Sequence, residues 1–115
     1  MISLTLPYPP SANKLWRAVR GRNIKSGHYR EWLSRCVACI AMHQPEKLTG
    51  GYVLDVTAYP PDRRARDLDN LFKALNDALA LAGVVSNDSK CRVINARWAD
   101  EVRPHGELRV KLEAA

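Results

Sequence analysis

Alternating hydrophobic and polar residues predict two strands in the first half of the chain. Apolar residues occupy every second position of 2–6, and Tyr52, Leu54, Val56 and Ala58 form one face of 52–59. A period of two is typical of a half-buried strand. Prolines at positions 7 and 60 end both segments, because proline has no N–H to donate to a sheet.

Two other segments repeat at the spacing of a helix. The segment 29–43 places Trp32, Cys36, Cys39 and Ile40 on one face, which we expect to point to a core. The second stripe consists of Leu68, Leu71, Phe72, Leu75, Leu79 and Ala82. Gly83 then stands directly after the stripe, where a glycine commonly ends a helix.

The remaining segments complete an α+β order. The stretch 11–30 has weak periodicity and predicts an irregular loop, whereas 91–99 and 107–113 predict two strands joined as a hairpin around 100–106. The predicted order is β-α-β-α-β-β, a two-layer sandwich in which two helices cover one face of a mixed β-sheet. A length of 115 residues fits a single domain over 1–115.

Composition indicates a globular protein of a reducing compartment. Hydrophobic residues make up 46% of the chain and charged residues 26%, and no apolar run approaches the roughly 18 residues that cross a bilayer. The first residues lack the pattern of a secretory signal. Three cysteines are too few for a disulfide framework, and Cys36 and Cys39 lack a second ligand pair for zinc, which favours buried thiols. We expect a cytoplasmic protein that binds no membrane.

The formal net charge of +6 favours a polyanionic partner, of which nucleic acid is the commonest. Basic residues concentrate in 13–35, where Glu31 is the single acid and Trp16, Tyr29 and Trp32 are interleaved. Such a segment is either a solvated basic face or a surface that contacts phosphates while its aromatic residues stack on bases.

The segment 63–79, RRARDLDNLFKALNDAL, places three arginines before two aspartates at the start of the second helix. Asp67 has the position of an N-cap and Asp69 complements the helix dipole, so both have an ordinary structural interpretation. At roughly 100° per residue, however, Asp69, Lys73 and Asn76 share one exposed strip away from the leucines. The strip is either an ordinary i,i+4 ion pair or part of a functional site.

Asp88 lies downstream of this helix, in the turn SNDSK. A helix of about 15 residues is roughly 22 Å long, so Asp88 reaches the Asp67 end if the chain doubles back or if two subunits meet there. Both arrangements stay open, as does an ordinary turn. Acids beside arginines suit a divalent cation, since Mg²⁺ prefers carboxylate, water and phosphate oxygens. Such an ion polarises a scissile phosphate, and a nearby lysine stabilises the developing negative charge.

Two stretches together resemble a known family. The segment 60–91, PPDRRARDLDNLFKALNDALALAGVVSNDSKC, and the segment 6–17, LPYPPSANKLWR, are similar to the RusA family of Holliday junction resolvases. The resemblance extends over most of the chain. It implies a homodimeric, Mg²⁺-dependent endodeoxyribonuclease, with Mn²⁺ as a substitute ion, that cuts two opposed strands of four-way DNA junctions in recombination and repair. It also implies a nucleoid-associated protein of bacterial or phage origin.

By position, Asp67, Asp69 and Asp88 match the family's catalytic metal ligands, and Lys73 matches its catalytic lysine. Asn70 belongs to the same Asp-Leu-Asp-Asn signature and is expected to position ligands. The basic residues expected to contact DNA are Lys14, Arg17, Arg20, Arg22, Arg63, Arg64 and Arg66. Trp16 is a candidate wedge that opens the junction, with packing in the core or a loop as an equal alternative.

Asn87 departs from the family pattern, because family members often carry two adjacent acids where this chain has Asn87 and Asp88. The departure keeps open a protein that binds branched DNA without cutting it. A less selective Mg²⁺-dependent nuclease that acts on flaps or other branches is a further alternative.

Overall fold

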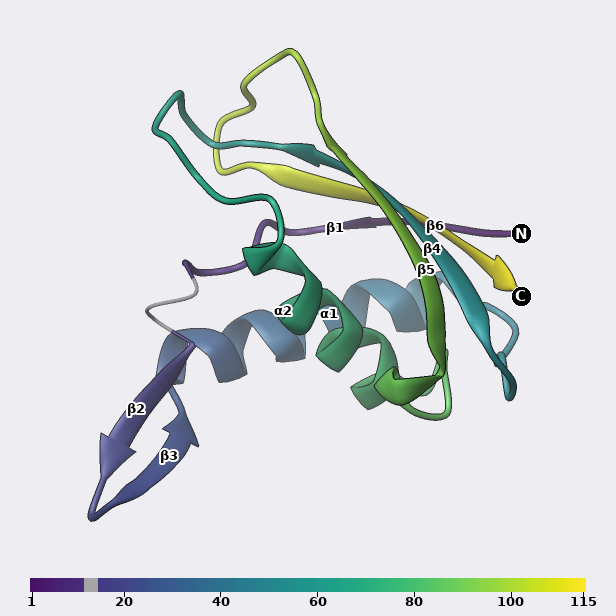
Figure 1. Cartoon of the computed structure of the whole chain (residues 1–115), viewed down its shortest axis with the longest axis horizontal. Helices are drawn as coiled ribbons and strands as arrows, with labels where there is room; N and C mark the ends of the chain where they lie inside the picture. Colours follow the sequence, from purple (N-terminus) through teal and green to yellow (C-terminus); the bar gives the residue numbers. More distant parts are fainter. Residues whose placement is uncertain (12–14) are drawn as a thin grey trace.

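A four-stranded mixed sheet and two helices form the body of the protein in the computed structural model, which describes residues 1–11 and 15–115 (Figure 1). The strands are β1 (Ile2–Leu6), β4 (Tyr52–Tyr59), β5 (Cys91–Trp98) and β6 (Glu107–Ala114), in the sheet order β1-β6-β4-β5. Strand β6 is antiparallel to β1 and β4, whereas β4 and β5 are parallel. This arrangement confirms the predicted α+β class.

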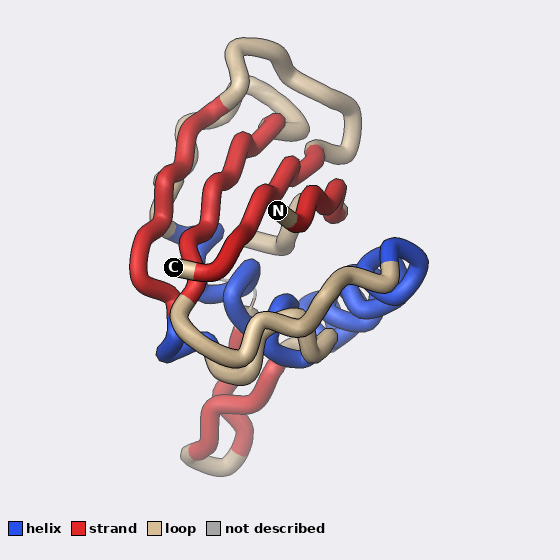
Figure 2. The backbone as a smooth tube through the Cα atoms, turned by 90° about the vertical axis from the view of Figure 1, so that its right-hand side faces the viewer, coloured by secondary structure: helices blue, strands red, loops and turns tan. Residues whose placement is uncertain are grey.

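Helices α1 (Gly27–His43) and α2 (Asn70–Leu81) cover one face of this sheet, and the opposite face is open (Figure 2). The predicted inner face of β4 is confirmed, since Tyr52, Leu54, Val56 and Ala58 are buried while their neighbours are half-buried. No helix in the described part of the chain is long and apolar enough to span a membrane.

Local sequence fixes one end of each helix. Helix α1 begins after Ser26, whose Oγ accepts the backbone N–H of Tyr29 at 3.1 Å, as an N-cap serine does. Helix α2 ends before Gly83, which has a φ of +80°. The next N–H, from Val84, donates to the carbonyl of Leu79 at 3.1 Å and closes the last turn. The predicted role of Gly83 is therefore confirmed.

The last two strands are not neighbours, so the predicted hairpin around 100–106 is wrong. Parallel strands need a crossover connection, and α2 followed by the short 3₁₀ helix η2 (Asp88–Lys90) provides it between β4 and β5. Strand β6 then lies between β4 and β1. Alternation in the sequence shows which face of a strand is buried, but it does not show which strand lies beside it.

A separate two-stranded hairpin occupies half of the stretch 11–30, for which the sequence predicts an irregular loop. Its strands are β2 (Trp16–Val19) and β3 (Arg22–Lys25), joined by a two-residue turn in which Arg20 and Gly21 both have positive φ. Positive φ at both turn residues is the geometry that matches the twist of paired strands. Each strand is short and none of its residues is buried, so the stretch lacks the periodic signal of a core strand.

Candidate active site

The two aspartates of the Asp-Leu-Asp-Asn signature precede the first residue of α2. Asp69, not Asp67, occupies the N-cap position, and its side chain accepts no capping hydrogen bond. The carbonyl of Asp67 accepts the N–H of Asn70 at 3.3 Å. Both aspartates are exposed. The Asp69 carboxylate is therefore not committed to holding the helix start, which leaves it available to a ligand.

Lys73 lies one turn into α2, and the structure brings Asp88 to it within a single chain. The Nζ of Lys73 is 3.7 Å from Oδ2 of Asp88. Asp88 begins η2, which packs against α2 before β5 starts. The crossover between parallel strands thus returns the downstream acid to Lys73 on the helix of the same chain.

Asn76 does not share the exposed strip with Lys73, so this part of the prediction is wrong. Asn76 is buried, and its Oδ1 accepts the hydroxyl hydrogen of Tyr52 at 2.5 Å while its amide donates to the carbonyl of Phe72 at 3.1 Å. Asp77 takes the place beside Lys73. Helical spacing alone does not separate these two neighbours, because the choice depends on which side of α2 faces the sheet.

Asp77 is a site residue that the sequence reasoning missed. Its Oδ1 accepts a hydrogen bond from Lys73 at 2.8 Å, and its Oδ2 accepts one from the hydroxyl of Tyr29 in α1. The hydrogen bond to Asp77 raises the pKa of Lys73, and the Asp88 carboxylate adds to this. Burial, followed by the hydrogen bond to Asp77, raises the pKa of Tyr29, which stays a donor. The i,i+4 spacing of Lys73 and Asp77 could have indicated their ion pair from the sequence.

The three predicted metal ligands do not form one cluster in the described part of the chain. Among residues 1–11 and 15–115, no three His, Cys, Asp or Glu side chains come close enough to hold a metal ion together. Mg²⁺ usually binds through one or two carboxylates together with water and substrate phosphates. Of the three, Asp88 lies beside Lys73, and Asp67 and Asp69 are exposed just before α2.

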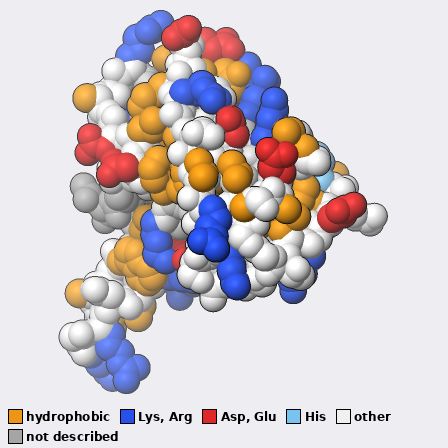
Figure 3. Space-filling view, turned by 45° about the vertical axis from the view of Figure 1, so that its right-hand side comes forward, with side chains coloured by type: hydrophobic (Ala, Val, Ile, Leu, Met, Phe, Trp, Pro, Cys, Tyr) orange, Lys and Arg blue, Asp and Glu red, His pale blue; other side chains and the backbone are white. Residues whose placement is uncertain are grey.

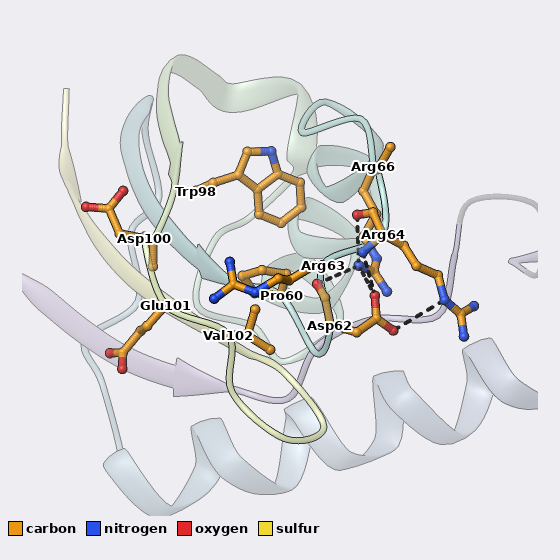
Figure 4. A pocket seen from close by; sticks show the side chains of 11 residues that line it. Pro60, Asp62, Arg63, Arg64, Arg66, Trp98, Asp100, Glu101 and Val102 are labelled. Atoms are coloured by element: carbon orange, nitrogen blue, oxygen red, sulfur yellow. Dashed lines mark hydrogen bonds and ion pairs between the residues drawn. The ribbon is translucent and has the colours of Figure 1, made fainter.

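The loop before α2 holds the arginine cluster in place through Asp62, a residue that the sequence reasoning also missed. Asp62 pairs with Arg66 at 2.8 Å and with Arg64 at 3.6 Å, and Figure 4 shows these contacts beside Trp98. The hydrogen bond from Arg66, aided by the backbone N–H of Arg64, lowers the pKa of Asp62 to about 2. Arg63 is exposed on the same loop. All three predicted arginines thus lie together next to the acids.

A hollow of about 430 Å³ adjoins the start of α2 and brings Asp67 and Asn70 together. Tyr8 forms part of its wall, and the guanidinium of Arg66 lies over the Tyr8 ring at 6.0 Å from the centroid. The ring also packs tightly on Gly106, where an added Cβ would lie 2.7 Å from Cβ of Tyr8. The wall beside the signature is therefore a fixed aromatic surface.

The predicted DNA contacts of the N-terminal region lie on the hairpin. Arg17, Arg20 and Arg22 are exposed there, and Figure 3 shows basic side chains at the hairpin tip, away from the body. Lys14, another predicted contact, lies outside the described residues. Trp16 is 40% exposed and packs edge-on against the Tyr29 ring at 6.0 Å.

The interpretation of the aromatic residues in 13–35 needs one correction. Tyr29 and Trp32 are buried, because both lie on the inner side of α1, so they are not available to stack on bases. Cys36 is buried on the same side, and burial raises the pKa of its thiol to about 12. All three cysteines are free thiols; Cys36 is buried as predicted, whereas Cys39 and Cys91 are half-buried.

Comparison with known proteins identifies the family of this chain. The family model described as Endodeoxyribonuclease RusA matches residues 7–113. A crossover junction endodeoxyribonuclease RusA of Escherichia coli (strain K12) is 39% identical over 95 residues, which cover 76% of this chain and 74% of that protein. The crossover junction endodeoxyribonuclease of Enterobacteria phage 82 is 38% identical over 94 residues, which cover 76% of this chain and 73% of that protein. The chain therefore belongs to the RusA family of endodeoxyribonucleases.

Proposed function

We propose that this protein is a Mg²⁺-dependent crossover junction endodeoxyribonuclease that resolves four-way DNA junctions by paired cuts. Membership of the RusA family supports a nuclease that acts on DNA. The observation that carries the proposal is the 3.7 Å approach of Asp88 to Lys73, on the helix that the two signature aspartates precede. We further propose that residues 1–115 act as one domain, at the nucleoid in the cytoplasm of a bacterial host.

Each group at the start of α2 has a distinct role in this proposal. Asp67 and Asp69 hold the ion, and Asn70 orients ligands in the hollow that it shares with Asp67. A bound Mg²⁺, or Mn²⁺ in its place, supplies Lewis-acid polarisation of the phosphate and activation of water. The exposed ammonium of Lys73 faces the phosphate oxygens on which negative charge builds in the transition state. Asp88 completes the acidic side of the site.

Basic side chains bind the sugar-phosphate backbone on both sides of these acids. The hairpin supplies Arg17, Arg20 and Arg22, and the loop before α2 supplies the arginines paired with Asp62. Such contacts release counterions, so junction affinity falls as salt rises. Replacing Arg20 by alanine should lower the slope of log affinity against log salt by about 1. Trp16 is half-exposed at the hairpin base and is the proposed wedge.

Paired cuts also require two sites, and a two-fold homodimer places identical sites on two equivalent strands. In one chain Asp67 and Asp69 precede α2 while Asp88 lies one turn or more along it. We propose that DNA and the partner subunit bring these groups to one phosphate. Light scattering under cutting conditions should give the mass of a dimer, and a monomer that still makes paired cuts would contradict this arrangement.

Cleavage of a synthetic four-way junction tests the metal site. With Mg²⁺, the wild type should release nicked duplexes, and Asp69→Asn should not, although it still binds the junction. Glu113→Gln is a matched control, because it removes one exposed carboxylate from β6 on the open face of the sheet. Equal cutting by the Asp69 variant and this control would reject the site.

The role of Lys73 needs its own measurement, because a lysine near DNA can act in binding or in catalysis. Lys73→Ala should bind the junction with nearly wild-type affinity and cut it slowly. Lost affinity with an unchanged saturated rate would instead make Lys73 a phosphate contact.

Asn87 bears on the alternative of a protein that binds without cutting. Its Oδ1 accepts the N–H of Ser89 at 2.9 Å and caps η2. This role needs no charge, so Asn87 is compatible with the proposed place of Asp88 beside Lys73. A binding protein would show no Mg²⁺-dependent nicking of any substrate. A panel of junctions, flaps and linear duplexes distinguishes the less selective nuclease.

A further inference from the structure

Lys73 has two carboxylates within reach, and the nearer one lies outside the proposed metal site. Its Nζ is 2.8 Å from Oδ1 of Asp77 and 3.7 Å from Oδ2 of Asp88. The side chains are 59% exposed for Lys73, 14% for Asp77 and 42% for Asp88. Asp77 is therefore both the closer and the more enclosed partner of the ammonium.

The Asp77 carboxylate is itself held from the core. The hydroxyl of Tyr29 donates to its Oδ2, while Lys73 occupies the other oxygen. Tyr29 belongs to α1, is fully buried, and is stacked on Trp32 with ring centroids 6.2 Å apart. An ordinary i,i+4 pair on an exposed helix face has no such anchor and contributes little. Here a rigid aromatic side chain from another helix sets the direction of the carboxylate.

Removing the Asp77 charge would leave Asp88 as the nearest carboxylate to the ammonium. A closer Lys73–Asp88 pair would occupy an acid of the proposed site and draw the ammonium away from the DNA. We infer that Asp77 is a positioning residue, anchored by Tyr29, which holds Lys73 toward the scissile phosphate and keeps it from pairing with Asp88 more closely than 3.7 Å. This inference rests on the proposed catalytic role of Lys73.

A purely structural alternative makes different predictions. If Asp77 only ties α1 to α2, its replacement lowers stability but leaves the cutting rate of the folded protein unchanged. Asp77→Asn suits this comparison, because the amide oxygen can still accept the Tyr29 hydroxyl while the charge that attracts Lys73 is gone. Tyr29→Phe is the complementary variant, since it keeps the buried ring and removes the hydrogen bond alone.

The experiment is single-turnover cutting of a four-way junction with enzyme in excess and Mg²⁺, with affinity measured separately by gel shift without Mg²⁺. Asp77→Asn should cut about 10–100-fold more slowly with an affinity within about twofold of wild type. Tyr29→Phe should be slowed in the same direction, and Glu113→Gln should behave as wild type. In the double variant Lys73→Ala/Asp77→Asn, cutting should be no slower than in Lys73→Ala, because Asp77 acts through Lys73.

The outcomes separate this inference from the proposed function. Two results overturn the positioning role while the proposed function stands. One is a wild-type cutting rate for Asp77→Asn. The other is a double variant that cuts more slowly than Lys73→Ala by the same factor by which Asp77→Asn is slower than wild type. Wild-type cutting by Lys73→Ala overturns the role of the lysine, and the inference with it. If circular dichroism shows that Asp77→Asn is unfolded, Tyr29→Phe decides: slowed cutting at unchanged affinity supports the inference, and wild-type cutting overturns it.

Discussion

Gly106→Ala should destabilise the protein by about 2–5 kcal/mol, because this position combines crowding with a left-handed backbone. Its φ is +69°, and an added Cβ would lie 2.7 Å from both Cβ and Cγ of Tyr8. A left-handed conformation costs a non-glycine residue about 1–2 kcal/mol. Overpacking adds about 1–3 kcal/mol, since Cβ of Tyr8 cannot move away without a shift of the Tyr8 backbone.

Two other glycines separate these contributions. Gly83→Ala keeps the strain without the crowding, because its φ is +80° and nothing lies within 4 Å of an added Cβ. It should cost about 1–2 kcal/mol. Gly50→Ala meets neither problem and should stay within about 0.5 kcal/mol of wild type.

Urea unfolding followed by tryptophan fluorescence measures all three variants, provided the dependence of free energy on urea is unchanged. We expect Gly106→Ala to be the least stable and Gly50→Ala the most stable. Equal destabilisation by Gly106→Ala and Gly83→Ala would refute the contact with Tyr8. Because Tyr8 lines the hollow of Asp67 and Asn70, Gly106→Ala should also slow junction cutting in the folded protein.

Three further predictions test the core and the arginine loop. Leu75→Ala should lower the free energy of unfolding in urea by about 2–5 kcal/mol because Leu75 is buried. Leu81→Ala, at an exposed position, should change it little, and equal losses in the two variants would contradict the packing. Tyr52→Phe should lower the free energy of unfolding by about 1–3 kcal/mol, since Oδ1 of buried Asn76 loses the hydroxyl that donates to it. An unchanged urea midpoint would argue against this hydrogen bond. The Arg66 hydrogen bond lowers the pKa of Asp62 from 3.8 to about 2, so its stabilisation is present above pH 3.8 and lost as the pH falls through about 2. The Tm advantage of wild type over Asp62→Asn should shrink across that range, and a constant difference would contradict the ion pair.

The elements with strong periodicity could be predicted from the sequence, and those that depend on distant partners could not. Strand β4 and helix α2 each carry an unbroken apolar pattern, and Gly83 marks where α2 ends. The β2–β3 hairpin has no buried face, so its strands leave no pattern to detect. The separation of β5 from β6 follows from the parallel pairing with β4, which no local signal specifies.

The candidate site divides in the same way. The signature from Asp67 to Lys73 was visible as spacing on one helix, and the family resemblance that it carried is confirmed. The return of Asp88 to Lys73 depends on the crossover. Whether Asn76 or Asp77 lies beside Lys73 depends on how α2 is rotated against the sheet. The anchor at Tyr29 lies 48 residues away from Asp77 in sequence and needs the packing of α1 on α2.

The β2–β3 hairpin keeps the basic residues that are proposed to contact DNA apart from the residues that form the core. All side chains of its two strands are exposed or half-buried, so substitutions at the tip leave the core unchanged. The basic residues there can therefore be replaced with little effect on folding. Transplanting the hairpin tip is therefore a way to change the proposed DNA contacts while leaving the core of the protein unchanged.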